Sequence, residues 1–261
     1  MENNLELKNI DKSEFRTVGK NTEKMESITR PNLTYWKDAW RRIKKNKVAF
    51  IALMLIAFYV LMAVFAPILS KYEYTAIDSS KMNQFISSEH WFGTDELGRD
   101  LWVRVWRGAR VSLTIGFVAT IMNTIVGGLV GGVSGYYGGK LDTFIMRFID
   151  VMYGIPTLIV QILVMVVLKP GVKALIIAMC ITGWIGSARF VRGEVYRLKE
   201  QDFVAAAKVL GVSNFTIIIR HLIPNIMGLI ITNVTMAVPS AIFSEAFLSY
   251  IGLGIAPPEC S

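Results

Sequence analysis

The sequence predicts an all-α protein that crosses a membrane several times, with about five transmembrane helices. Of the 261 residues, 53% are hydrophobic, and the mean hydropathy is +0.45, which is too apolar for a soluble domain of this length. Charged residues still make up 18% of the chain, so polar ends and loops must accompany the spans. Uncharged runs long enough to cross a hydrocarbon core of about 30 Å recur along the sequence.

The basic residues are concentrated at the N-terminal end. The net charge is +8, twelve of the 28 Lys and Arg residues precede Val48, and none follows His221. A basic end beside the first apolar run is the positive-inside signal, and it predicts a multi-pass protein of the cell membrane whose N-terminus is cytoplasmic. No nucleic-acid-binding motif accompanies the charge, so we expect no nucleic-acid partner.

The first 110 residues divide into four segments. Residues 1–34 are polar and of mixed charge, which predicts a disordered cytoplasmic N-terminus. Residues 35–47 place two indoles on one helical face among basic side chains, which predicts an interfacial helix that contacts membrane lipid. Residues 48–70 form the first predicted transmembrane helix, and 71–110 form an extracytoplasmic loop.

One His and three carboxylates lie close together in the later part of this loop, between His90 and Asp100. A metal site is one hypothesis, but the spacing matches neither a zinc pattern nor an EF-hand loop. We therefore expect turn and cap chemistry, with Arg99 paired to a neighbouring acid and no metal. The two cysteines, Cys180 and Cys260, predict neither a disulfide framework nor a metal site.

The remaining residues, 111–261, contain four further apolar runs. We expect spans over 111–139, over 151–168 with Pro156 near the inner end, over 174–188, and over 222–244 with a kink at Pro239. Glycines recur four apart in the first of these runs, a spacing that lets helices pack backbone to backbone in lipid. The predicted packing glycines are Gly127, Gly128, Gly131, Gly132 and Gly135.

A polar segment, residues 189–224, separates the last two runs. Four of its residues recur with helical spacing and predict one face of a short helix: Phe203, Ala206, Ala207 and Leu210. We expect Gly211 to end this helix as a C′ glycine, Ser213 to cap a second short helix, and Pro224 to mark the next run. Such a hairpin suits docking into a partner's groove. An ordinary amphipathic interfacial hairpin is the alternative.

This segment resembles a known family. The runs DFVAAAKVLG and IIIRHLIPN are similar to the EAA loop of ABC-importer permeases, whose coupling helix seats in the cytoplasmic ATPase. Ala205 stands where the family carries a glutamate, and Asp202 is the nearest substitute. Three further runs resemble the branch of the family that imports di- and oligopeptides or nickel: HWFGTDELGRD, SGYYGGKLDTFIMRFID and SEAFLSYIGLG.

The resemblance implies a permease subunit without an ATPase site or cofactor of its own, because no phosphate-cradling G-x-x-x-x-G-K-[ST] loop is present. It implies four partners: a second homologous permease, two cytoplasmic ATPase subunits that bind the ATP, and an extracytoplasmic binding protein. The implied substrate is a di- or oligopeptide, with nickel as the alternative. The implied coupling residues are Asp202, Phe203, Ala206, Ala207, Leu210, Gly211 and Pro224.

Two features of the C-terminal part remain. Glu245 is expected at the outer interface, and a role in the substrate path or an outer gate is the alternative. The family usually has six spans, so the five expected here imply that the final one is missing. We also considered a membrane-embedded enzyme and a secondary transporter. The enzyme would need paired reactive groups at membrane depth, and the transporter would need buried ionisable groups and inverted repeats. The sequence shows none of these features.

Overall fold

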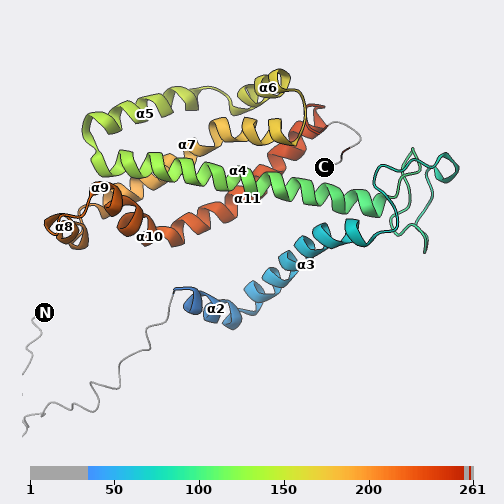
Figure 1. Ribbon diagram of the computed structural model, residues 1–261, viewed down its shortest axis with the longest axis horizontal. Helices are drawn as coiled ribbons and strands as arrows, with labels where there is room; N and C mark the ends of the chain where they lie inside the picture. Colours follow the sequence, from blue (N-terminus) through green and yellow to red (C-terminus); the bar gives the residue numbers. More distant parts are fainter. Residues whose placement is uncertain (1–34, 256–258, 260–261) are drawn as a thin grey trace, which may run out of the picture. The chain divides into compact units, whose positions relative to one another are not determined.

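The computed structural model describes residues 35–255 and 259, and within these residues the regular elements are helices joined by loops, with one isolated bridge between Thr94 and Asp100 (Figure 1). The predicted disorder of residues 1–34 lies outside the described residues. The chain divides into two compact units, 1–56 and 57–261, which are described separately.

The described part of the first unit contains helix α2 (Tyr35–Lys45) and the first half of α3 (Lys47–Leu69). In α2 the carboxylate of Asp38 accepts hydrogen bonds from Arg41 at 2.9 Å and Arg42 at 2.7 Å, one turn ahead of it. The ammonium group of Lys44 lies 5.3 Å from the centre of the Trp40 ring. The helix falls within the predicted 35–47 segment, and its contact with lipid stays a prediction.

Within the part of the chain that the structure describes, four helices are long and apolar enough to cross a membrane: α3, α4 (Leu101–Tyr137), α7 (Val172–Leu198) and α11 (Met227–Tyr250). Two others, α5 (Gly139–Gly154) and α6 (Thr157–Leu168), meet at an angle of 79° and count as a fifth span if the bent pair is taken as one. The predicted all-α polytopic fold with about five transmembrane helices is therefore confirmed. The short elements are η2 (Ser79–Lys81), α8 (Asp202–Val209), α9 (Asn214–Thr216), the π-helix η3 (Ile217–Leu222) and α10 (Ile223–Asn225).

Several predicted boundaries differ from the structure, and the last span covers Met227–Tyr250 instead of 222–244. Helix α4 begins at Leu101, inside the predicted loop, because the Asp100 side chain accepts a hydrogen bond from the Val103 amide and caps the helix. Helix α7 continues ten residues past 188, so that Arg189–Leu198 is part of a long helix and not of the polar hairpin.

The third predicted span is broken into two helices. Pro156 has no N–H to donate and forces the preceding residue out of the helical region, so Ile155 is extended at φ −89° and ψ 124°. The chain therefore leaves α5 at Gly154 and starts α6 in a new direction. The twelve residues of α6 span only about 18 Å, which is too short for a crossing on their own.

Helix α4 packs against α7 and α11 and forms the centre of the second unit (Figure 1). Glycine allows the close approach to α7. A Cβ on Gly131 would lie 2.3 Å from the Ala188 carbonyl oxygen, and one on Gly135 would lie 2.7 Å from the Arg192 carbonyl oxygen. A Cβ on Gly127 would lie 2.5 Å from the Cβ atom of Ser187. These three glycines form the contact stripe.

The other two predicted packing glycines behave differently. A Cβ on Gly132 would lie 3.1 Å from the Ile218 side chain, so it faces η3 and not α7. A Cβ on Gly128 would meet no atom within 4 Å, and close packing therefore does not require a glycine there. The sequence prediction missed Gly183 of α7, where a Cβ would lie 2.2 Å from the Asn123 amide nitrogen.

Candidate functional site

The polar hairpin between α7 and α11 is built on an apolar base. Helix α8 turns Val204 and Ala207 inward, where they are 0% and 7% exposed. They belong to one apolar cluster, the hairpin core, together with residues of α4, α7, η3 and α11. The buried members of the hairpin core are Tyr136, Val191, Val195, Val204, Ala207, Ile217, Ile218, Leu222, Ile226 and Ile230.

The face predicted for α8 is divided between this core and the surface. Ala207 is buried, whereas Phe203 is 39% and Leu210 80% exposed, and Ala206 is exposed as well. The reason is that Val204, outside the predicted set, shares the inward face with Ala207 one turn later. Phe203, Ala206 and Leu210 are three and four residues apart and form the outward stripe of α8. Asp202 is exposed in the first turn.

Gly211 ends α8 in the way the sequence predicts. It lies at φ +75°, in the left-handed region. Its N–H bonds to the Lys208 carbonyl at 3.0 Å, and the Val212 N–H bonds to the Ala207 carbonyl at 3.1 Å, which is the bond pattern of a Schellman motif. Val212 packs against the hairpin core that includes Ala207, so the turn is closed by an apolar contact.

The return from the turn leads directly into the next span. The Ser213 hydroxyl accepts a hydrogen bond from the Thr216 amide at 3.3 Å and caps α9, as predicted. Helix η3 then buries Ile217, Ile218 and Leu222. Pro224 lies exposed in α10, at the start of the last run.

A contact to α4 holds the tip of the hairpin. The Tyr136 hydroxyl donates a 2.8 Å hydrogen bond to the Asn214 side chain, and the Lys208 ammonium group lies 5.3 Å from the centre of the Tyr136 ring. Tyr136 is not among the residues predicted from the sequence. Its only signal was its position in the SGYYGG run.

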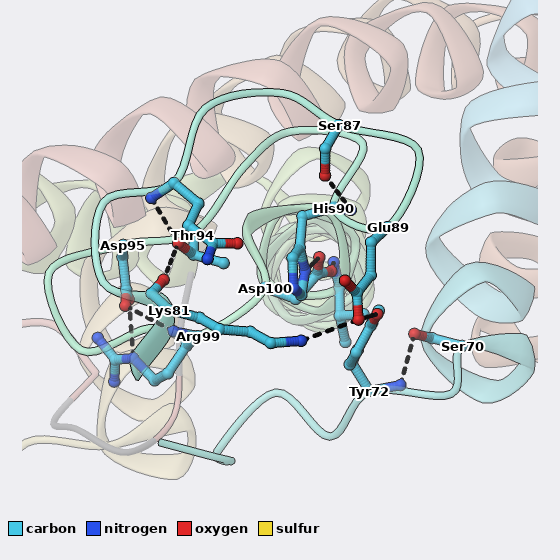
Figure 2. A network of polar contacts seen from close by, with 12 residues as sticks. Ser70, Tyr72, Lys81, Ser87, Glu89, His90, Thr94, Asp95, Arg99 and Asp100 are labelled. Carbon is cyan, nitrogen blue, oxygen red and sulfur yellow. Dashed lines mark hydrogen bonds and ion pairs between the residues drawn. The ribbon is translucent and has the colours of Figure 1, made fainter. Parts of the chain in front are cut away.

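The loop between α3 and α4 folds around a polar network (Figure 2). The His90 Nδ1 and an Asp100 carboxylate oxygen lie 2.8 Å apart, with each side chain 3% exposed. The Thr94 hydroxyl accepts a hydrogen bond from the Gln84 amide at 2.9 Å and donates one to the Lys81 carbonyl. Asp100 therefore serves two roles, as the partner of His90 and as the cap of α4.

The expected pairing of Arg99 is confirmed. Its Nε donates to Asp95 at 2.7 Å, and the Asp95 carboxylate also accepts from the Leu97 and Arg99 amides at 2.9 and 3.0 Å. Burial alone would raise the pKa of Asp95, but these three donors outweigh it and hold the pKa below its usual value. The pKa of Glu89 is lowered too, mainly by its hydrogen bond from Lys81 at 2.8 Å.

Glu245 lies five residues before the end of α11 and is 1% exposed. Its carboxylate accepts hydrogen bonds from Ser112 of α4 at 2.7 Å and from Ser249 at 3.0 Å. The sequence predicts the outer interface for this residue. Its position near the helix end agrees with that count along the chain, but its side chain is turned into the packing between α4 and α11.

Comparison with known proteins agrees with this architecture. Residues 124–260 match the family described as "Binding-protein-dependent transport system inner membrane component", and residues 34–85 match "N-terminal TM domain of oligopeptide transport permease C".

Individual relatives cover nearly the whole chain. The oligopeptide transport system permease protein OppC of Bacillus subtilis (strain 168) is 44% identical over 98% of this chain and 84% of its own length. The dipeptide transport system permease protein DppC of the same strain is 48% identical, over 90% and 74%. The OppC protein of Escherichia coli (strain K12) is 38% identical, over 97% and 83%. The chain belongs to the family of inner membrane components of binding-protein-dependent transport systems.

Proposed function

We propose that this chain is a permease subunit of an ATP-driven importer of di- or oligopeptides in the cell membrane, with its N-terminus in the cytoplasm. It forms the translocation path together with a second, homologous permease. Two cytoplasmic ATPase subunits bind the ATP, and an extracytoplasmic binding protein delivers the peptide. The permease itself carries no catalytic site or cofactor. The names of its relatives favour peptides over nickel.

One observation carries the proposal: the outward stripe of α8 is exposed, while the opposite face of the same helix is buried in the hairpin core. Phe203 and Leu210 expose apolar surface on the same short helix whose other face is fixed in the hairpin core. A large apolar side chain on a small, fixed helix suits a groove in a partner, and the fixed base lets a push on α8 reach the spans. Asp202 and the exposed Ala206 would complete this ATPase-facing surface.

The test introduces charge on the outward stripe and compares it with charge beside the stripe. We expect Ala206→Asp and Leu210→Asp to leave insertion intact, because both positions are exposed. Each should abolish co-purification with the ATPase subunits and peptide-stimulated ATP hydrolysis. Ala205→Glu is the matched control, since this exposed position carries glutamate in the resembling family. Unchanged peptide uptake by the first two variants would contradict the proposal.

Substrate is tested separately, in a strain that lacks the chromosomal copy. Uptake of labelled di- and oligopeptides should depend on the chain, and uptake of labelled nickel should not. The reverse result would assign the nickel alternative and leave the coupling site untouched.

A further inference from the structure

Two ion pairs fasten α5 to α7. Arg192 of α7 donates from Nε and from a terminal nitrogen to the two carboxylate oxygens of Asp142, both at 2.5 Å. Arg189 donates to Asp150 through one contact, also 2.5 Å. Because the first pair uses two parallel hydrogen bonds, it fixes the direction of both side chains as well as their separation.

The Arg192–Asp142 pair joins three helices. The Asp142 carboxylate also accepts a hydrogen bond from the Ser134 hydroxyl of α4, and Ser134 is fully buried. The side chain of Asp142 is 11% exposed and that of Arg192 is 35% exposed. In the second pair the corresponding values are 55% for Asp150 and 40% for Arg189, so water screens it far more.

Arg192 lies on the part of α7 that contributes to the hairpin core beneath the proposed coupling helix. Its neighbours on α7, Val191 and Val195, pack in the hairpin core with Val204 and Ala207 of α8. The Arg192 backbone also touches Gly135 of α4. A displacement of α8 therefore reaches α7 at the turn that carries the Arg192 guanidinium.

Helix α5 leads from this pair to the break at Ile155. Its apolar contacts with α7, centred on Ile149 and Ile185, are non-directional and do not by themselves fix the register of the two helices. Beyond the break, α6 packs against the opposite half of α7, where Met165 and Leu175 belong to one buried apolar cluster. The two helices of the bent pair are thus attached at different levels of α7, with the 79° bend between them.

We propose that Arg192 and Asp142 are positioning residues that transmit the movement of α8 to α5, so that α5 and the coupling helix move as one piece and the chain flexes at Gly154–Pro156. The inference rests on the proposed function of α8 as the ATPase-docking helix. Without the paired hydrogen bonds, α5 keeps its apolar contacts but loses its register on α7. ATP hydrolysis would then no longer move the bent pair.

The experiment uses the assembled transporter in proteoliposomes, with peptide uptake and ATP hydrolysis measured on the same preparation. We expect Asp142→Asn to retain co-purification of the ATPase subunits but to lower the number of peptides imported per ATP hydrolysed. The expected loss is about tenfold, within the range for one coupling interaction between distant sites. The matched control is Asp150→Asn, which breaks the exposed pair on the same two helices and should leave this ratio unchanged.

Exchange of the two charges separates positioning from simple stability. Asp142→Arg with Arg192→Asp in one chain should recover a large part of the ratio that either single change removes. If Asp142→Asn lowers the amount of inserted protein, Arg192→Lys gives the same test per inserted subunit, because it keeps the charge but lacks the two parallel bonds.

The outcomes distinguish the two proposals. An unchanged ratio in Asp142→Asn and in Arg192→Lys, with Leu210→Asp still inactive, would overturn the positioning role and leave α8 as the docking helix. Activity of Leu210→Asp at the normal level would overturn the docking proposal itself. An equal loss in Asp142→Asn and Asp150→Asn, without recovery on charge exchange, would show a structural role only.

Discussion

The hairpin between α7 and α11 and the loop between α3 and α4 are both polar in sequence, yet different forces hold them. The hairpin is built on apolar side chains of five helices, and its outward stripe is apolar too. The loop, residues 71–100, is held by hydrogen bonds and ion pairs among its own side chains, such as His90 with Asp100 and Arg99 with Asp95. Its exposed tip is apolar, with Phe85 94% and Ile86 77% exposed.

This difference has a mechanical consequence. An apolar base that includes α7 and η3 joins the hairpin to the spans, so force applied to α8 is carried into the membrane-spanning part. The polar network of the loop closes largely on itself. It contacts the first turns of α4, through the Asp100 cap and through Arg104, which donates to the Tyr74 carbonyl at 3.2 Å. A polar stretch of sequence can therefore either pass force to the membrane spans or form a surface that is held by its own contacts. Which of the two it does depends on whether its buried side chains pack against the spans.

The largest expected effect is a charge in the hairpin core. Ala207→Asp places a carboxylate where Ala207 is 7% exposed and belongs to an apolar cluster, and an unpaired buried charge costs several kcal/mol. We expect the hairpin to unfold locally and limited proteolysis to cleave it, while the loop at residues 71–100 stays resistant. Ala206→Asp, one residue earlier but exposed, should leave proteolysis unchanged. Equal resistance of both variants would show that the core does not hold the hairpin.

The next effect concerns the loop. Asp100→Ala removes the α4 cap, worth about 0.5–2 kcal/mol, and also leaves the buried His90 Nδ1 without a partner. Protease sites within residues 71–100 should become accessible while those in the hairpin do not. Asp78→Ala is the control, because Asp78 caps only the exposed turn η2. If both regions became accessible together, the loop would not be self-contained.

A smaller effect is expected at the α8 turn. Gly211→Val puts a β-branched residue at φ +75°, which costs at least about 1–2 kcal/mol. We expect weaker ATPase co-purification and a lower peptide-stimulated hydrolysis rate, since Leu210 is displaced. Gly211→Asn should recover most of the rate, because asparagine tolerates the left-handed conformation. A Cβ there meets no atom within 4 Å, so crowding plays no part in the result.

Local signals made the C-terminal end of α8, the cap of α9 and the pairing of Arg99 predictable. Gly211, Ser213 and the Asp95–Arg99 spacing act over four residues or fewer, and all three behave as their chemistry requires. The number of spans also followed from hydropathy alone. What remained hidden depends on distant partners. No local pattern around Val204 in the sequence indicates that residues of α7 and η3 pack against it.

The broken span shows the same limit. Pro156 was noticed, but the size of the bend depends on where α5 and α6 attach to α7, and hydropathy carries no such information. Likewise, Asp142 and Arg192 are fifty residues apart, and the glycine-mediated approach of α4 to α7 brings Arg192 beside the Ser134–Asp142 contact. A charged residue within a polar run can be recognised in the sequence, but the distant residue that it pairs with cannot.

The smallest expected effect is a difference in pH response between the two regions. Asp95 has a lowered pKa in the folded loop, so its contribution to loop stability is complete above the unfolded-state value of about 3.9 and is lost as the pH falls through the folded value. Amide exchange at Leu97 and Arg99, corrected for its intrinsic pH dependence, should accelerate below about pH 4. The hairpin core contains no carboxylate, so exchange at Val212 should not follow this change.

Asp95→Asn should raise exchange in the loop already at neutral pH and flatten its response to acid. A common acid transition at all three amides would mean that loop and hairpin unfold as a single unit, and the contrast drawn between them would fall.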